Sequence, residues 1–154
     1  MKHKCNVEKL VLPLGGLAQA YGVDADALKT QIEKEITAIV MTFAGAGSMV
    51  EVLYDEGGSR LDIFQYFAVE PNKERDASHL PLESARRLDT RMDYYDELGL
   101  DRYRLTEQEL EVLEVSADSQ EKMRMTIQET LRSLLRDAMV KAGREDALEE
   151  AGLG

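Results

Sequence analysis

The sequence has one cysteine, no tryptophan, three prolines and only two histidines in 154 residues. The single cysteine, Cys5, excludes a disulfide within the chain and is typical of a protein kept in a reducing compartment. No run of residues approaches the roughly 18 consecutive apolar residues that a membrane-spanning helix needs. We therefore expect a soluble, cytoplasmic protein without a membrane partner.

One apolar run near the amino terminus has features of a secretory signal. It covers residues 10–18 and leads into the small-residue pattern Ala18-Gln19-Ala20, which is similar to a cleavage site. Pro13 and two glycines interrupt the run, so we interpret it as the first helix of the fold.

The sequence offers few residues for metal binding or catalysis. His3 and Cys5 are separated by one residue, but two ligands do not complete a tetrahedral metal site. No nucleophile motif surrounds Cys5 or any serine. The carboxylate pairs Asp55-Glu56 and Glu149-Glu150 fall in a predicted turn and in the terminal segment, where we expect them to be solvated, whereas acid and base roles require burial. We therefore expect no enzymatic activity, no metal and no cofactor.

The charge is strongly negative but unevenly distributed. The chain has 30 acidic and 19 basic residues, a net charge of −11, which argues against broad nucleic-acid binding. The segment from Ser119 to Arg144 carries six cations and three anions, a local charge of +3, so the remainder carries −14. A solvated amphipathic helix is the simplest interpretation of this segment. The alternative is a basic helix that orients the molecule against a partner with both signs of charge.

Helical periodicity predicts a helical pair in the first third of the chain. Pro13 starts a short helix, because proline is tolerated in the first helical turn. A longer helix begins at Asp24 or Asp26 and ends at the glycine-rich residues 44–48. Its apolar residues recur at three- and four-residue spacings: Leu28, Ile32, Ile36, Ile39, Val40 and Phe43.

The pattern then changes to the alternation that is typical of β-strands. Residues 50–54 and 61–69 are two alternating runs, and the turn between them is Glu56-Gly57-Gly58-Ser59. The second run is apolar on both faces at its centre. We therefore predict a β-hairpin whose second strand is covered on both sides.

Three more elements are expected after the hairpin. A short helix begins at Pro81, and residues 110–115 are interpreted as a third strand, although they also fit a helical template. Residues 89–106 show no clear period and are taken as irregular. A long helix begins at the capping box of Asp118 and Glu121 and ends at Gly143. This order predicts an α+β domain: a helical pair, a small, mostly antiparallel sheet with a β-hairpin, a short helix and a long carboxy-terminal helix.

Several local motifs occur in this same order. The segment His79-Leu80-Pro81-Leu82-Glu83-Ser84-Ala85-Arg86-Arg87-Leu88-Asp89 resembles the I-[ST]-L-E-E-A-R-K-I-D stretch in the amino-terminal domain of NusA, the bacterial transcription elongation, termination and antitermination factor. Residues 50–61 are similar to the first strand, acidic-glycine turn and second-strand opening of that domain. Val69-Glu70-Pro71 matches the end of its hairpin, and residues 23–40 its long helix. Residues 113–115 and the helix from Asp118 resemble its last strand and connecting helix.

The resemblance implies a fold and a role. It covers roughly residues 14–142 and implies one NusA amino-terminal-like domain over 1–154, with 1–12 and 145–154 flexible and no S1 or KH domain. It implies a factor that docks on bacterial RNA polymerase beside the RNA exit channel, near the β-subunit flap. There it would modulate pausing, termination or antitermination without catalysis, and contact nascent RNA only indirectly or weakly. One departure is Pro81, which stands where the family has a Ser/Thr helix cap.

The last helix carries the expected contacts. Arg124, Arg132 and Arg136 share this helix, and by analogy with the family we expect them to face polymerase or RNA. A monomer is expected. The alternative function is a small self-associating structural or adaptor protein that dimerises through the same helix. Three methionines would then lie at or beside its seam, since Met fills apolar surfaces adaptably: Met123, Met125 and Met139.

Overall fold

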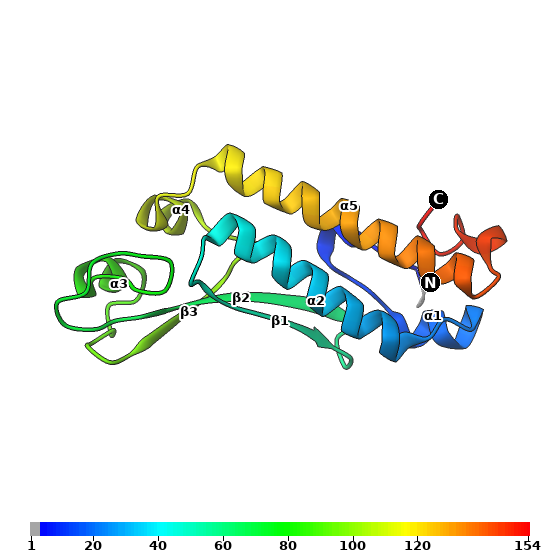
Figure 1. The fold of residues 1–154 in the computed structure, drawn as a ribbon, viewed down its shortest axis with the longest axis horizontal. Coiled ribbons are helices and arrows are strands. Elements are labelled where there is room, and N and C mark those ends of the chain that lie inside the picture. The colour runs from blue at the N-terminus through cyan, green and yellow to red at the C-terminus, as the bar shows by residue number, and fades with distance from the viewer. Residues whose placement is uncertain (1–3) are drawn as a thin grey trace. The chain divides into compact units, whose positions relative to one another are not determined.

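The computed structural model describes residues 4–154, so His3 lies outside the described residues. This range forms five α-helices and one three-stranded sheet of order β1-β2-β3 (Figure 1). The helices are α1 (Leu14–Tyr21), α2 (Ala25–Ala44), α3 (Leu82–Leu88), α4 (Glu107–Leu113) and α5 (Ala117–Lys141). The strands are β1 (Met49–Asp55), β2 (Arg60–Ala68) and β3 (Glu97–Asp101). The predicted α+β class is confirmed, including the helical pair, the hairpin and the long last helix.

The helix ends follow ordinary capping chemistry. Gly22 adopts a φ of +74° and ends α1, because glycine reaches the left-handed region without strain. Of the two predicted caps for α2, Asp24 is the one used: its Oδ1 accepts from the Ala27 N–H at 3.1 Å. For α5 the predicted cap Asp118 is wrong by two residues. Ser116 Oγ accepts from the Ser119 N–H at 3.0 Å, and the helix begins at Ala117.

The third strand is β3, which lies within residues 89–106, where the sequence predicts no regular element. It pairs antiparallel with β2, and Leu98 and Leu100 are buried between exposed neighbours. Gly99 stands opposite Tyr66, and a Cβ on Gly99 would lie 2.8 Å from the ring of Tyr66. The close approach of this ring requires a glycine at the centre of the strand.

Residues 110–115 do not form the predicted third strand. Most of them belong to helix α4, which starts at a capping box: Thr106 Oγ1 accepts from the Glu109 N–H, and the Glu109 carboxylate accepts from the Thr106 N–H. These two reciprocal bonds satisfy amides that a helix start leaves open, and so favour the helix.

The described chain divides into two compact units, which we call unit 1 and unit 2. Unit 1 contains residues up to 38, 52–62 and 125–154, and unit 2 contains 39–51 and 63–124. The core of unit 2 is a cluster of apolar side chains from β2, β3 and α3 and the segments next to them: Phe67, Val69, Leu80, Ala85, Met92, Leu98 and Leu100.

Both ends of the described chain contribute to the core of unit 1, so the expected core of 14–142 is too narrow. Apolar side chains of residues 5–12 and 147–153 are buried, among them Leu12 and Leu153. The Cys5 N–H donates to the Ala151 carbonyl at 2.9 Å. Leu10 and Leu12 also exchange backbone hydrogen bonds with the hairpin, at Leu61 and Ser59. Burial and backbone pairing hold both segments in place.

The hydroxyl of Tyr54 ties the amino-terminal segment of unit 1 to β1. It donates to the Leu12 carbonyl and accepts from the Leu14 N–H at 3.1 Å, and the side chain is buried. Both partners are buried backbone groups at the start of α1, and they also bond to each other, since the Leu14 N–H donates to the Leu12 carbonyl at 2.9 Å.

Replacing Tyr54 with phenylalanine therefore removes two hydrogen bonds from buried backbone groups, which then keep only their bond to each other. We expect the Tyr54→Phe variant to lose about 1 to 3 kcal/mol of unfolding free energy, measured by urea denaturation. Tyr95→Phe is the matched control, because Tyr95 is 81% exposed and its hydroxyl has water available. Equal stability of the two variants would refute this role for Tyr54.

Candidate functional site

The three predicted arginines all lie on α5, but the structure gives them different surroundings. Arg124 is engaged inside unit 2: its NH1 donates to the Tyr103 carbonyl at 2.8 Å, and its guanidinium lies 4.4 Å from the Tyr103 ring centroid. Its Nε also lies 3.6 Å from a Glu121 carboxylate oxygen. These contacts fix Arg124 as a packing residue of unit 2.

Arg132 and Arg136 are brought together in unit 1. They line a groove of about 370 Å³, which we call the α5 groove. Arg136 is exposed, whereas Arg132 is half-buried and its NH1 lies 3.4 Å from the Gly152 carbonyl that it donates to. The other lining residues are acidic, polar or apolar: Glu129, Ser133, Asp137, Val140, Glu145 and Leu148.

The α5 groove is therefore mixed in charge. Three carboxylates accompany the two arginines, so a polyanion such as RNA would meet repulsion as well as attraction. Val140 is 49% exposed and supplies an apolar contact beside the charges. A protein surface with charges of both signs and an apolar side chain matches this groove better than a phosphate backbone does.

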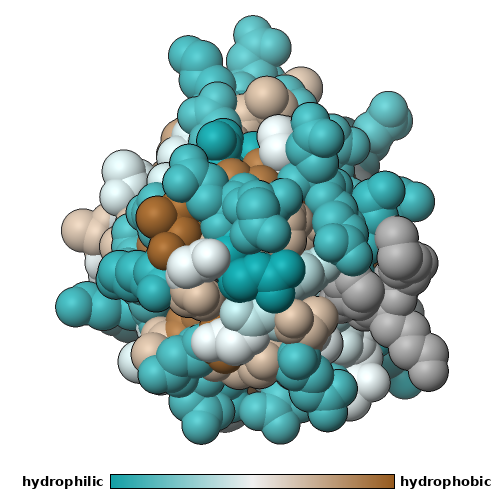
Figure 2. Space-filling model, turned by 90° about the vertical axis from the view of Figure 1, so that its right-hand side faces the viewer, coloured by the Kyte–Doolittle hydropathy of each residue, from teal (hydrophilic) through white to brown (hydrophobic). Residues whose placement is uncertain are grey.

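One face of the molecule is predominantly polar. Figure 2 shows one face of the molecule, on which hydrophilic residues predominate and hydrophobic residues form only small, separated patches. Met123 and Met139 are buried within the chain, and of the three methionines predicted for a dimer seam only Met125 is exposed, at 46%. The surface of α5 therefore gives the self-association alternative little support.

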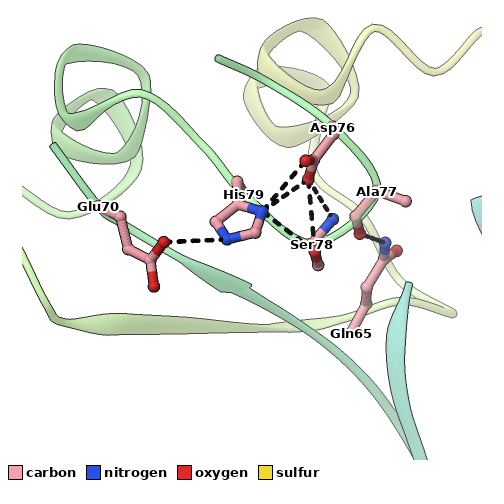
Figure 3. A network of polar contacts seen from close by, with 6 residues as sticks. All are labelled: Gln65, Glu70, Asp76, Ala77, Ser78 and His79. Atoms are coloured by element: carbon pink, nitrogen blue, oxygen red, sulfur yellow. Dashed lines mark hydrogen bonds and ion pairs between the residues drawn. The ribbon is translucent and has the colours of Figure 1, made fainter. Parts of the chain in front are cut away.

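A polar network surrounds His79 in unit 2 (Figure 3). His79 Nδ1 lies 2.9 Å from Asp76 Oδ1 and 3.2 Å from Ser78 Oγ, and Nε2 lies 3.4 Å from Glu70 Oε2. The Ser78 N–H donates to Asp76 at 2.8 Å. This N–H, together with the His79 ring, holds the pKa of Asp76 below its usual value.

The network contains serine, histidine and aspartate but lacks the geometry of a catalytic triad. In a triad the serine and the acid contact opposite ring nitrogens, so that the base can take the serine proton. Here both contact Nδ1, and Nε2 faces a second carboxylate. The network instead fixes residues 76–79 against the end of β2, where Ala68 also pairs with His79.

Next to this network lies a buried positive charge that sequence reasoning missed. Arg102 follows β3 and is 2% exposed. Its Nε donates to Gln65 Oε1 at 2.9 Å, and its NH1 donates to Gln120 Oε1. Burial lowers the pKa of Arg102, since a charge is less stable away from water. One sequence signal was available: Gln65 is the polar residue at an inward position of an apolar strand.

Cys5 has the properties of a structural thiol. It is 7% exposed, and burial raises its pKa to about 12, an effect that the nearby charge of Arg132 opposes only in part. The thiolate is the reactive form of cysteine. Within residues 4–154 there is also no group of three or more His, Cys, Asp or Glu residues that could hold a metal ion. No helix in the same range is long and apolar enough to cross a membrane.

Comparison with known proteins gives a likeness to a solved structure. No family model matches the chain, and no curated protein matches it. The solution structure of the N-terminal domain of NusA from B. subtilis is similar with a TM-score of 0.48 and 14% sequence identity. The likeness covers 86% of this chain and 98% of that one.

The raised pKa of Cys5 has a direct chemical consequence. Because the pKa of Cys5 in the folded protein, about 12, lies above its ordinary value of 9.0, the thiolate fraction at pH 8 is about a thousandfold smaller than in the unfolded chain. We expect alkylation of the native protein by iodoacetamide at pH 8 to be at least about a hundredfold slower than in 8 M urea. Mass spectrometry reads the product without ambiguity, since the chain has one cysteine. Similar rates in both conditions would contradict the burial of this thiol.

Proposed function

We propose that this chain is a non-enzymatic docking domain of the NusA amino-terminal type. In this proposal it binds bacterial RNA polymerase in the cytoplasm, near the RNA exit channel and the β-flap, and modulates pausing, termination or antitermination. It acts as a monomer and meets nascent RNA only indirectly or weakly, because the α5 groove carries more carboxylates than cations.

The observation that carries the proposal is the motif of residues 79–89, which contains helix α3, the first helix after the hairpin. Three of its residues have a physical task there. Ala85 is fully buried in the unit 2 core. Arg86 Nε donates to the Met92 carbonyl at 2.9 Å, and Asp89 Oδ1 accepts from the Arg91 N–H at 3.0 Å. The motif thus specifies a helix and the turn after it.

The other elements that the resemblance implied agree only in part with the elements of this chain. Residues 23–40 lie mostly in α2, and residues 50–61 form β1, the turn and the start of β2, as the resemblance implied. The α3 helix begins after Pro81 without a side-chain cap. Residues 113–115 do not form the last strand that the resemblance implied: the last strand of this chain is β3, and it precedes α4.

The α5 groove is the contact surface in this proposal. Arg132 and Arg136 supply the cations, Glu129 and Glu145 supply anions, and Val140 supplies an exposed apolar side chain. Charges of both signs set the register of a docked partner and accelerate its approach, whereas the apolar contact contributes to the lifetime of the complex.

The test is retention of the tagged protein by bacterial core RNA polymerase and by the isolated β-flap at low salt. We expect binding that weakens as salt rises, and the double variant Arg132→Ala/Arg136→Ala to bind at least about tenfold more weakly, as expected for the loss of two charge pairs. Arg91→Ala is the matched control, because the Arg91 side chain is 89% exposed and lies in the other unit.

Two results would reject the proposal. One is the absence of retention of the unaltered protein on either polymerase preparation. The other is unchanged retention of the double variant, which would exclude the α5 groove as the contact surface. The helical content of each variant, measured by circular dichroism, shows whether a loss of retention comes from unfolding.

A further inference from the structure

Unit 2 contains a pocket of about 260 Å³ beside Arg102. One part of its wall is apolar and includes Phe67, Leu80 and Leu113. The polar part includes Arg102, Arg75 and Asp76. The pocket is smaller than the 300 to 1,000 Å³ that is typical of sites for drug-sized ligands. It therefore suits a compact molecule that has both an apolar and a charged part.

The charge on Arg102 has no carboxylate partner among residues 4–154. Its two side-chain acceptors, Gln65 and Gln120, are neutral amides. Both amides are oriented by further bonds: Gln65 Nε2 donates to the Ala77 carbonyl at 3.4 Å (Figure 3), and Gln120 Nε2 donates to the Arg102 carbonyl at 3.0 Å. The amide oxygens consequently face the guanidinium, yet neither one neutralises it.

A buried guanidinium without an anion is an unusual arrangement. Arginine keeps its proton in proteins, and charges away from water are generally paired. The guanidinium has five N–H groups, of which the two glutamines take one each. Donors therefore remain for an acceptor that enters from the pocket. A carboxylate fits this planar fork, since it accepts two parallel N–H bonds.

We propose that this pocket binds a small organic monocarboxylate with an apolar body, whose carboxylate pairs with Arg102. The apolar wall accommodates the body of the ligand. Asp76 selects against ligands of higher charge: it also lines the pocket, and its carboxylate is held by Ser78 and His79. A phosphate dianion would meet this carboxylate, whereas a monocarboxylate directed at Arg102 brings less opposing charge.

The site lies within unit 2 and does not use the α5 groove of unit 1. A failure of ligand binding in the pocket can therefore be distinguished from a failure of polymerase docking.

The probes are benzoate, its neutral analogue benzamide, and inorganic phosphate, each titrated into ¹⁵N-labelled protein and followed by NMR. We expect benzoate to shift the side-chain amide signals of Gln65 and Gln120 in a saturable manner. Benzamide and phosphate should bind at least about tenfold more weakly, because one lacks the charge and the other lacks the apolar body.

Two variants test separately the charge of Arg102 and the space in the pocket. Arg102→Met removes the charge and keeps an apolar side chain of similar length, and Val115→Phe adds bulk to the pocket wall while leaving Arg102 in place. Each should weaken benzoate binding at least about tenfold. Arg124→Met is the matched control, since Arg124 lies in the same unit but does not line the pocket.

Three outcomes would overturn the assignment. They are the absence of saturable shifts with benzoate, equal affinity for benzamide or phosphate, and undiminished benzoate affinity in a folded Arg102→Met or Val115→Phe variant.

Discussion

The guanidinium of Arg102 joins three segments of unit 2 through neutral amides. Gln65 on β2 accepts a hydrogen bond from Arg102 Nε, and Gln120 on α5 accepts one from Arg102 NH1. Gln65 then extends the connection to the loop at Ala77, next to the His79 network. Loss of the guanidinium would leave two oriented amide oxygens without a donor in the interior of the unit. The positions of β2, the loop at Ala77 and the start of α5 consequently depend on one another.

Contacts within the chain also change how the positive charge of α5 is understood. The segment from Ser119 to Arg144 carries +3 on an acidic chain, but much of that charge is used internally. Arg124 lies against Tyr103, and the Arg144 guanidinium lies 5.2 Å from the Tyr21 ring centroid and pairs with Asp146. Arg132 and Arg136 remain in a groove that also holds carboxylates. The helix therefore presents a mixed surface, and its formal charge overstates its attraction for RNA.

Sequence patterns predicted the elements whose signals are local. The spacing of Leu28, Ile32 and Ile36 predicted α2, and the alternation around the Gly57-Gly58 turn predicted the hairpin. The capping box that starts α4 at Thr106 was also visible in the sequence. It was overlooked because the apolar residues that follow it fit a strand and a helix equally well over so short a window.

Other features depend on contacts between distant residues. Gly99 weakens the strand pattern of β3 in the sequence. The glycine is needed there because the ring of Tyr66, which lies on β2, approaches it closely. The burial of Leu12 and Leu153 depends on pairing between the two ends of the described chain. The predicted arginines illustrate the same limit: their common helix was visible, but the contact of Arg124 with Tyr103 was not. Nothing local indicated that Arg102 is buried.

A double-mutant cycle between Gln65 and Arg102 tests most directly whether neutral amides hold this buried charge. Gln65→Leu alone leaves the guanidinium short of an acceptor, and we expect it to lower the unfolding free energy by about 1 to 3 kcal/mol. In the Arg102→Met background the same change should cost much less, because no charge remains to be satisfied, giving a coupling of about 1 kcal/mol or more. Additive effects of the two substitutions would contradict the account.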